Sequence, residues 1–407
     1  MTSTFECVLR GSILPGLTWA QTEVCATKSQ REKFAYRPGL KLMKTNVIEA
    51  TTSFEKWLGA QLPIIRQDLT LKHRHMAEAA FPFFRATFYR WLQLWPKVCG
   101  DVAKAPAVLA VGDLHIENFG TWRDSEGRLI WGVNDLDEAW PCAYTIDLVR
   151  LATSAYLAIL EEHLSLARRE ASAAIEAGYR DALAAGGKPF VLAEDNQWLR
   201  LLALGKLRDP VRFWDKLTHL PPFTAKPPRE VLRLLEESLP PRSNFQLKKR
   251  IAGLGSLGHP RILALSSWRT GLIAREAKAI RPSAWAWVKG TSSAEIHGAK
   301  LAERCLRVPD PFVRFHDRWL VRRLAPDCSR IELVSLARER DEARLLYSMG
   351  WETANMHFGS PQGMQAVKKD LAQRKGRWLH KAAKGMCKAT LKDWQDWREG
   401  WKKLAKG

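Results

Sequence analysis

Residues 107–138 read AVLAVGDLHIENFGTWRDSEGRLIWGVNDLDE, and this stretch decides how the rest of the chain is interpreted. The turn residues Asp-Ser-Glu-Gly at 124–127 lie between two apolar segments, which predicts a β-hairpin with strands at 119–123 and 128–133. A hairpin brings its two ends together. We therefore expect the polar residues just before it and just after it to occupy one small volume.

Three carboxylates and an amide flank this predicted hairpin, namely Asp113, Asn118, Asp135 and Asp137. Like charges this close are costly unless a cation neutralises them, and Mg²⁺ prefers such oxygen ligands together with phosphate oxygens. We predict that Asn118, Asp135 and Asp137 bind Mg²⁺, and that Asp113 accepts a hydroxyl proton during phosphoryl transfer. The alternative is an acidic turn whose side chains only cap backbone amides.

These motifs carry a resemblance to known families. GDLHIENFG at 112–120 resembles the Gly-Asp-x-His-x-x-Asn loop of aminoglycoside phosphotransferases and choline kinases, and NDLDE at 134–138 resembles their metal-binding segment. Taken with DLVRLA at 147–152, they more closely resemble the bacterial family called domain of unknown function 2252. The resemblance covers most of the chain from about residue 50. It implies a protein-kinase-like fold that uses ATP and Mg²⁺, and it implies no acceptor substrate.

A second pattern begins at the glycine-rich segment GLGSLGHPR, residues 253–261, which lies between predicted strands and is followed by a further strand at 271–280. Such a turn lets backbone amides approach phosphates closely, and a Lys on a following strand completes the kinase-style arrangement. The alternative is an ordinary hairpin with a surface Lys. The predicted phosphate-binding residues are Gly253, Gly255, Ser256, Gly258 and Lys278.

A helix predicted at 291–306 should supply the Glu that pairs with Lys278. Glu303 and Glu295 are both possible, and we prefer Glu303 because it lies deeper in the helix. The strands predicted within 311–325 would then lead to an inter-lobe hinge beside adenine.

The order of these motifs is unusual. The catalytic loop and metal segment come first and the glycine-rich loop, Lys and hinge come later, whereas ordinary kinase-like chains run the other way. We therefore predict an α+β, protein-kinase-like, two-lobed fold with circularly permuted order; the competing interpretation is that the glycine-rich loop belongs to an unrelated second domain. The predicted parts are an irregular arm at 1–50, a helical lobe at 51–245, a small antiparallel-sheet lobe at 246–325, and C-terminal helices at 326–407 that complete the helical lobe.

The composition favours a globular protein with anionic partners. Of 407 residues 46% are hydrophobic, and the net charge is +21. The cysteines are scattered without a C-x-x-C pair and we find no signal peptide, which favours a cytoplasmic protein. We predict no transmembrane segment, because no run approaches the roughly 18 apolar residues needed to span a bilayer. The basic tail from residue 366 carries Trp394, Trp397 and Trp401 on one helix face; it could bind nucleic acid or an anionic surface, but we favour packing on the protein itself.

The predicted function is that of an ATP- and Mg²⁺-dependent phosphotransferase acting on a hydroxyl of an unknown small molecule or protein. Nucleotidyl transfer and acyl-phosphate formation are alternatives on the same fold. A third alternative is a non-catalytic nucleotide- or nucleic-acid-binding protein that uses the basic tail. The strongly basic charge disfavours a polycationic antibiotic as acceptor.

Overall fold

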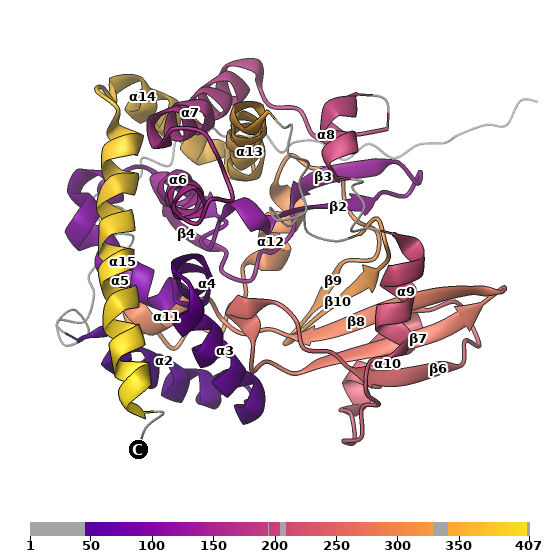
Figure 1. The fold of residues 1–407 in the computed structure, drawn as a ribbon. Helices are drawn as coiled ribbons and strands as arrows, with labels where there is room; N and C mark the ends of the chain where they lie inside the picture. Colours follow the sequence, from indigo (N-terminus) through magenta and orange to yellow (C-terminus); the bar gives the residue numbers. More distant parts are fainter. Residues whose placement is uncertain (1–44, 194, 204–208, 329–340, 405–407) are drawn as a thin grey trace, which may run out of the picture. The chain divides into compact units, whose positions relative to one another are not determined.

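The computed structural model describes residues 45–193, 195–203, 209–328 and 341–404 (Figure 1). The arm predicted at 1–50 lies outside the described residues except for 45–50.

The fold is mixed α+β with small antiparallel sheets, as predicted. The α-helices are α2 Val47–Gln61, α3 Arg66–Glu78, α4 Ala80–Ala86, α5 Phe88–Cys99, α6 Thr145–Leu160, α7 Arg168–Ala185, α8 Gln197–Ala203, α9 Pro210–Thr218, α10 Arg229–Ser238, α11 Ala284–Lys289, α12 Gly298–Arg304, α13 Glu342–His357, α14 Pro361–Gln373 and α15 Trp378–Leu404. The strands are β1 Ala107–Ala110, β2 Phe119–Arg123, β3 Leu129–Val133, β4 Trp140–Ala143, β5 Phe190–Val191, β6 Phe245–Lys249, β7 Arg261–Trp268, β8 Gly271–Ala279, β9 Arg314–His316 and β10 Trp319–Leu324.

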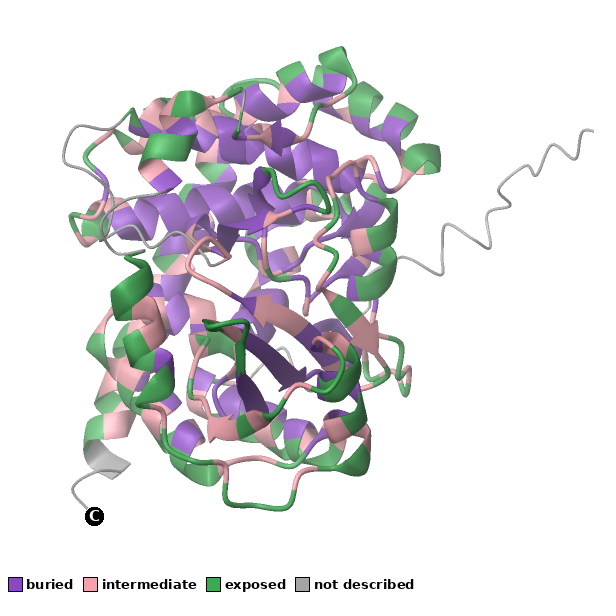
Figure 2. Cartoon of the chain, turned by 90° about the vertical axis from the view of Figure 1, so that its right-hand side faces the viewer, coloured by how far each residue is buried: buried purple, intermediate pink, exposed green. Residues whose placement is uncertain are grey.

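Helix α6 is the centre of the helical part. It is buried on all sides from Thr145 to Ala158, because its apolar residues surround the helix instead of forming a stripe. Helices α4, α7 and α15 contact it, and Figure 2 shows the buried residues running through the interior helices while exposed residues lie on outer faces and loops. The site described below is therefore attached to a rigid, fully buried helix.

Helices α7 and α13 pack so closely that two glycines are required at their contact. A Cβ on Gly178 would lie 1.9 Å from the carbonyl oxygen of Tyr347, and a Cβ on Gly350 would lie 2.1 Å from that of Ile175. Backbone atoms cannot move aside as a flexible side chain can. Any larger residue at either position must push the two helices apart.

Replacing Gly178 with alanine should therefore destabilise the protein, by about 1–3 kcal/mol, because the core at this contact becomes overpacked. Thermal unfolding monitored by circular dichroism measures the effect. Gly59→Ala is the matched control, since that exposed helical glycine has only ordinary contact space and alanine favours helix. Equal unfolding temperatures for Gly178→Ala and Gly59→Ala would contradict the close helix contact.

The five-stranded sheet has the order β6-β7-β8-β10-β9, and every pair is antiparallel. Helix α10 packs its buried leucines against one face, on Ile262, Ala277 and Val321. Helix α9 packs on Leu263 and Leu265, which alternate with Ile262 and so belong to the other face. Figure 1 shows both helices beside the sheet. The sheet part therefore includes α9 and α10, which precede the predicted start at residue 246.

The segment between β8 and β9 returns to the helical part. Helix α11 was not predicted, and its Trp287 packs edge-on against Phe54 in the large core. Gly290 adopts a left-handed conformation that ends α11, and the following residues are irregular as far as α12. The helix predicted at 291–306 is therefore confined to Gly298–Arg304.

The tryptophan face of the C-terminal helix packs on the protein itself, as we favoured from the sequence. Trp397 is buried, stacks on Trp401 and meets the ring of His73 of α3 edge-on. Among the described residues, no helix is long and apolar enough to span a membrane.

A buried carboxyl group on α13 contacts the hairpin strand β3. Glu352 accepts a hydrogen bond from the backbone amide of Val133 at 3.3 Å and one from Asn355 Nδ2 at 2.8 Å. Burial raises the pKa of Glu352 to about 7, and the hydrogen bonds and Arg307 oppose that rise. The folded protein therefore binds this proton more tightly than the unfolded chain does.

Stability should consequently depend on the ionisation of Glu352. Its contribution is complete below the ordinary glutamate pKa and is lost as the pH rises through about 7, a change of about 3 kcal/mol. Thermal unfolding at pH 5 and at pH 8 should show a decrease for the wild type, and Glu352→Gln should make that decrease smaller by the contribution of Glu352. The control Glu126→Gln, in an exposed turn, should retain the full decrease. A Glu352→Gln variant with the wild-type decrease would contradict this assignment.

Candidate active site

The predicted hairpin is confirmed, with Phe119 opposite Val133 and Arg123 opposite Leu129. Its two ends meet as expected from the sequence. The amide of Asn118 donates from Nδ2 to the backbone oxygens of Asp113, at 3.2 Å, and Asp135, at 3.3 Å. These bonds use the nitrogen of the side chain and leave its oxygen available as a ligand atom.

Asp113 is held by a guanidinium from the central helix. Arg150 Nε donates to Asp113 Oδ1 at 2.7 Å, and Nη2 contacts the same oxygen. The Arg150 side chain is fully buried and lies over the ring of Phe84. Burial raises the pKa of Asp113 to about 7, and the guanidinium limits that rise by favouring the carboxylate. Asp113 is therefore a fixed carboxyl group that can exchange a proton near neutral pH.

The backbone before Asp113 is braced by Asp147, which is completely buried near the start of α6. Its two oxygens accept from the amides of Val111 at 2.7 Å and Gly112 at 2.8 Å. His357, at the end of α13, shares the Asp147 Oδ2 atom through Nε2 at 3.0 Å and bonds Tyr179 through Nδ1 at 2.8 Å. Helices α6, α7 and α13 together fix the loop that carries Asp113.

Lys278 reaches the carboxylates from the five-stranded sheet. Its side chain is only 2% exposed, and its Nζ atom pairs with Asp137 Oδ2 and lies 3.5 Å from Asp135 Oδ1. Burial by itself would raise the pKa of Asp137, but Lys278 with nearby guanidiniums holds it below the usual range. The second oxygen of Asp137 is buried and has no hydrogen-bond partner in the part of the chain that the structure describes.

The glycine-rich loop lies against the same group. A Cβ built on Gly255 would be 3.9 Å from Asp113 Oδ2. The loop is attached to α3 and the residue before it, because Lys72 Nζ donates to the Gly255 oxygen at 3.3 Å and the Ile65 amide donates to the Gly258 oxygen at 2.9 Å. The glycine loop and the residues that flank the acidic hairpin are therefore adjacent.

Lys72 was not identified from the sequence. It is buried, and burial lowers its pKa to about 8 although Glu55, Glu138 and Asp113 favour the charged form. In the sequence Lys72 is one of several basic residues on a polar helix, and only its burial and its hydrogen bond to Gly255 distinguish it.

The expected pair between Lys278 and Glu303 is not formed. Glu303 is exposed on α12, and Glu295, the other choice, pairs with His297. The ion-pair partners of Lys278 among the described residues are Asp137 and Asp135. Our prediction placed Glu303 deep in a helix over 291–306, whereas α12 comprises only Gly298–Arg304 and its Leu301 is buried in the core of the helical part.

A buried acid does lie beside Lys278, but it comes from the same strand. Glu276 is fully buried on β8 and is two residues before Lys278, so the two side chains share one face of the sheet. Side chains two residues apart on a strand point to the same face, so the spacing of Glu276 and Lys278 in the sequence could have identified Glu276 as a neighbour of Lys278. The partners of Glu276 are three arginines, described below.

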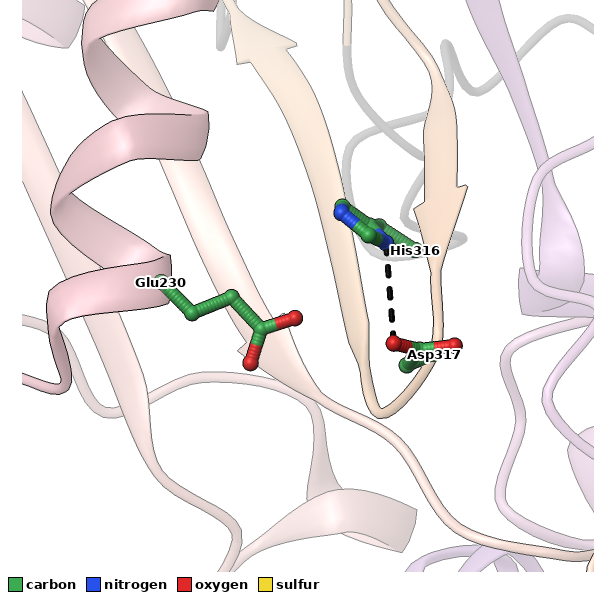
Figure 3. Close-up of side chains that lie close together, drawn as sticks. All are labelled: Glu230, His316 and Asp317. Atoms are coloured by element: carbon green, nitrogen blue, oxygen red, sulfur yellow. Dashed lines mark ion pairs between the residues drawn. The ribbon is translucent and has the colours of Figure 1, made fainter.

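A smaller group of ligand-type side chains lies at the edge of the sheet part (Figure 3). Glu230 comes from α10, whereas His316 and Asp317 come from β9 and the turn after it. Arg233 donates to His316 Nε2 at 2.8 Å, so that ring nitrogen already has a partner. We assign no metal to this group.

Comparison with known proteins identifies a similarity to a bacterial family. The model of a family described as "Uncharacterized protein conserved in bacteria (DUF2252)" matches residues 65–205. This span contains Asp113, Asn118, Asp135, Asp137 and Asp147, which confirms the resemblance found from the sequence over these residues. The glycine-rich loop and Lys278 lie beyond it. No curated protein and no solved structure matches the chain.

Proposed function

We propose that the protein is an ATP- and Mg²⁺-dependent phosphotransferase that acts on a hydroxyl group. The observation that carries this proposal is the position of Lys278 beside Asp135 and Asp137, from which it is separated by more than 140 residues in sequence. A buried ammonium, a glycine-rich loop and a cluster of oxygen ligands are the parts that phosphoryl transfer requires.

The oxygen ligands fit Mg²⁺. Asp135, Asp137 and the Asn118 side-chain oxygen are hard donors, and the buried Asp137 Oδ1 atom has no hydrogen-bond partner among the described residues. When bound there, the ion would neutralise charge on the phosphate oxygens. Lys278 and the backbone amides at Gly253, Gly255, Ser256 and Gly258 would position the phosphates.

Asp113 would accept the hydroxyl proton of the acceptor. Arg150 fixes one of its oxygens, and the other oxygen is directed toward Gly255. A carboxyl group with a pKa of about 7 can take up a proton at neutral pH and release it again, which is what a general base needs. Arg150 acts by orienting this carboxyl group.

We further propose that the fold is kinase-like with a circularly permuted chain order. Two contacts support this interpretation. The Leu109 amide donates to Ser360 Oγ at 2.8 Å, and His357 bonds Asp147 beside the Asp113 loop, although about 250 residues separate α13 from β1 in sequence. A chain running directly from α13 into β1 would have the ordinary kinase-like order, and such a rearrangement is tolerated where ends lie close together.

The proposal is tested by incubating the purified protein with Mg²⁺ and ATP against a panel of hydroxyl-bearing metabolites and proteins. We expect ADP release that depends on one acceptor and on Mg²⁺. Mass spectrometry of the acceptor should show the addition of one phosphate. Addition of a nucleotide would instead support nucleotidyl transfer, and Mg²⁺-independent ADP release would contradict the metal assignment.

A further inference from the structure

Three arginines meet around one buried carboxylate beside Lys278. Glu276 Oε1 accepts from Arg261 Nη1 at 2.9 Å and from Arg322 Nε at 2.9 Å, and Glu276 Oε2 accepts from Arg250. Burial by itself would raise the pKa of Glu276, but the three guanidiniums hold it well below its usual range. The carboxylate is therefore charged and fully engaged.

The strand register places these side chains on one face of the sheet. Arg261 of β7 is directly opposite Lys278 of β8, and Arg322 of β10 is directly opposite Glu276. Residues directly opposite one another in antiparallel strands share a face. This face points toward the acidic hairpin, since Lys278 reaches Asp135 and Asp137 from it.

The charged side chains around Glu276 and Lys278 carry a net positive charge. The four cations Arg250, Arg261, Arg322 and Lys278 are matched by three carboxylates, those of Glu276, Asp135 and Asp137. One positive charge is therefore in excess, and a Mg²⁺ ion on the hairpin would increase the excess to three. Buried charges need compensation, so the loaded site requires an anionic ligand with several charges.

The glycine-rich loop lies directly on this cluster. Arg261 Nη2 donates to Ser256 Oγ at 2.6 Å, and a Cβ on Gly253 would lie only 2.9 Å from that nitrogen. The Nε atom of Arg261 is buried without a hydrogen-bond partner in the described part of the chain. The side chains of Arg250 and Arg322 are each 24% exposed, so a ligand can reach them from solvent.

We propose that Arg250, Arg261 and Arg322 bind the polyphosphate chain of a nucleotide, an inference that rests on the proposed function. Guanidinium forks bind phosphate oxygens through paired hydrogen bonds. Lys278 lies beside the metal ligands Asp135 and Asp137, where the terminal phosphate would be transferred. Glu276 holds the three guanidiniums together against their mutual repulsion.

Calorimetric titration of the full chain tests this assignment with two probes, ATP and inorganic tripolyphosphate, each with Mg²⁺ at fixed ionic strength. We expect the wild type to bind both. Arg322→Gln and Arg250→Gln should each weaken both probes by roughly 10- to 100-fold, because each removes hydrogen bonds to a charged ligand. Arg314→Gln is the control, since that arginine is exposed on the same sheet, and it should bind like the wild type.

The outcomes separate this inference from the proposed function. Tripolyphosphate binding that depends on Arg322 supports the phosphate site even if no ATP is turned over. ATP turnover with unchanged affinity in both Arg322→Gln and Arg250→Gln would overturn the phosphate site while the proposed function stands. A wild type that does not bind tripolyphosphate would also overturn it. Thermal unfolding of each variant shows that the fold is kept, and two independent variants guard against the failure of one to fold.

Discussion

Replacing Asp113 with asparagine should lower the rate of phosphoryl transfer by roughly 10²- to 10⁴-fold, the range expected when a general base is removed. Asparagine has nearly the same shape and can still contact Arg150, so the loop should remain in place. The expected result is lost turnover with Mg²⁺-ATP affinity close to that of the wild type. Steady-state ADP release and calorimetry on the same preparation measure the two quantities.

A matched control for Asp113→Asn is Asp317→Asn, which changes an exposed aspartate in the turn before β10. It should leave both turnover and affinity unchanged. Turnover retained in Asp113→Asn would contradict the assignment of Asp113 as the base. Loss of nucleotide affinity together with turnover would indicate that Asp113 contributes to binding instead.

Asp135→Ala should abolish Mg²⁺-dependent turnover and leave the fold intact. The Asp135 side chain is 52% exposed, so its removal leaves no large buried cavity. It does remove one oxygen ligand of the proposed ion and one of the two carboxylates beside Lys278. Unfolding temperature and ADP release, each measured with and without Mg²⁺, check the two parts of this prediction.

The control for Asp135→Ala is Asp317→Ala, which removes a carboxylate that is 81% exposed, in the turn between β9 and β10. We expect wild-type turnover from this control. If purified, folded Asp135→Ala protein retained Mg²⁺-dependent turnover, the hairpin would not be the metal site.

The sequence predicted the hairpin and the strands of the larger sheet because their signals are local. The turn at 124–127 has Gly127 in a left-handed conformation and Asp124 accepting from the Arg128 amide, so the residues that fix the hairpin lie within the turn itself. The predicted strand at 271–280 agrees with β8, Gly271–Ala279, to within one residue. Such features need no knowledge of the rest of the chain.

The parts that were missed depend on contacts between distant segments. The three arginines around Glu276 come from β7, from β10 and from the end of β6, and in sequence each is an ordinary basic residue of a basic chain. We chose Glu303 as the partner of Lys278 because it lies far from the start of the helix predicted at 291–306, and that helix is shorter in the structure. Lys72 is distinguished only by burial under the glycine loop. Ion-pair partners in a folded protein follow from packing, which spacing along one segment does not specify.

The central claim is that the acidic hairpin and the sheet that carries Lys278 bind one nucleotide together. Titration of ATP into the full chain, with Mg²⁺ and with EDTA, tests it most directly when the wild type is compared with Asp135→Ala and Lys278→Met. We predict binding that requires Mg²⁺ and is weakened by both substitutions, one from each half of the site. Absence of binding by the wild type, or binding that neither substitution changes, would contradict the claim.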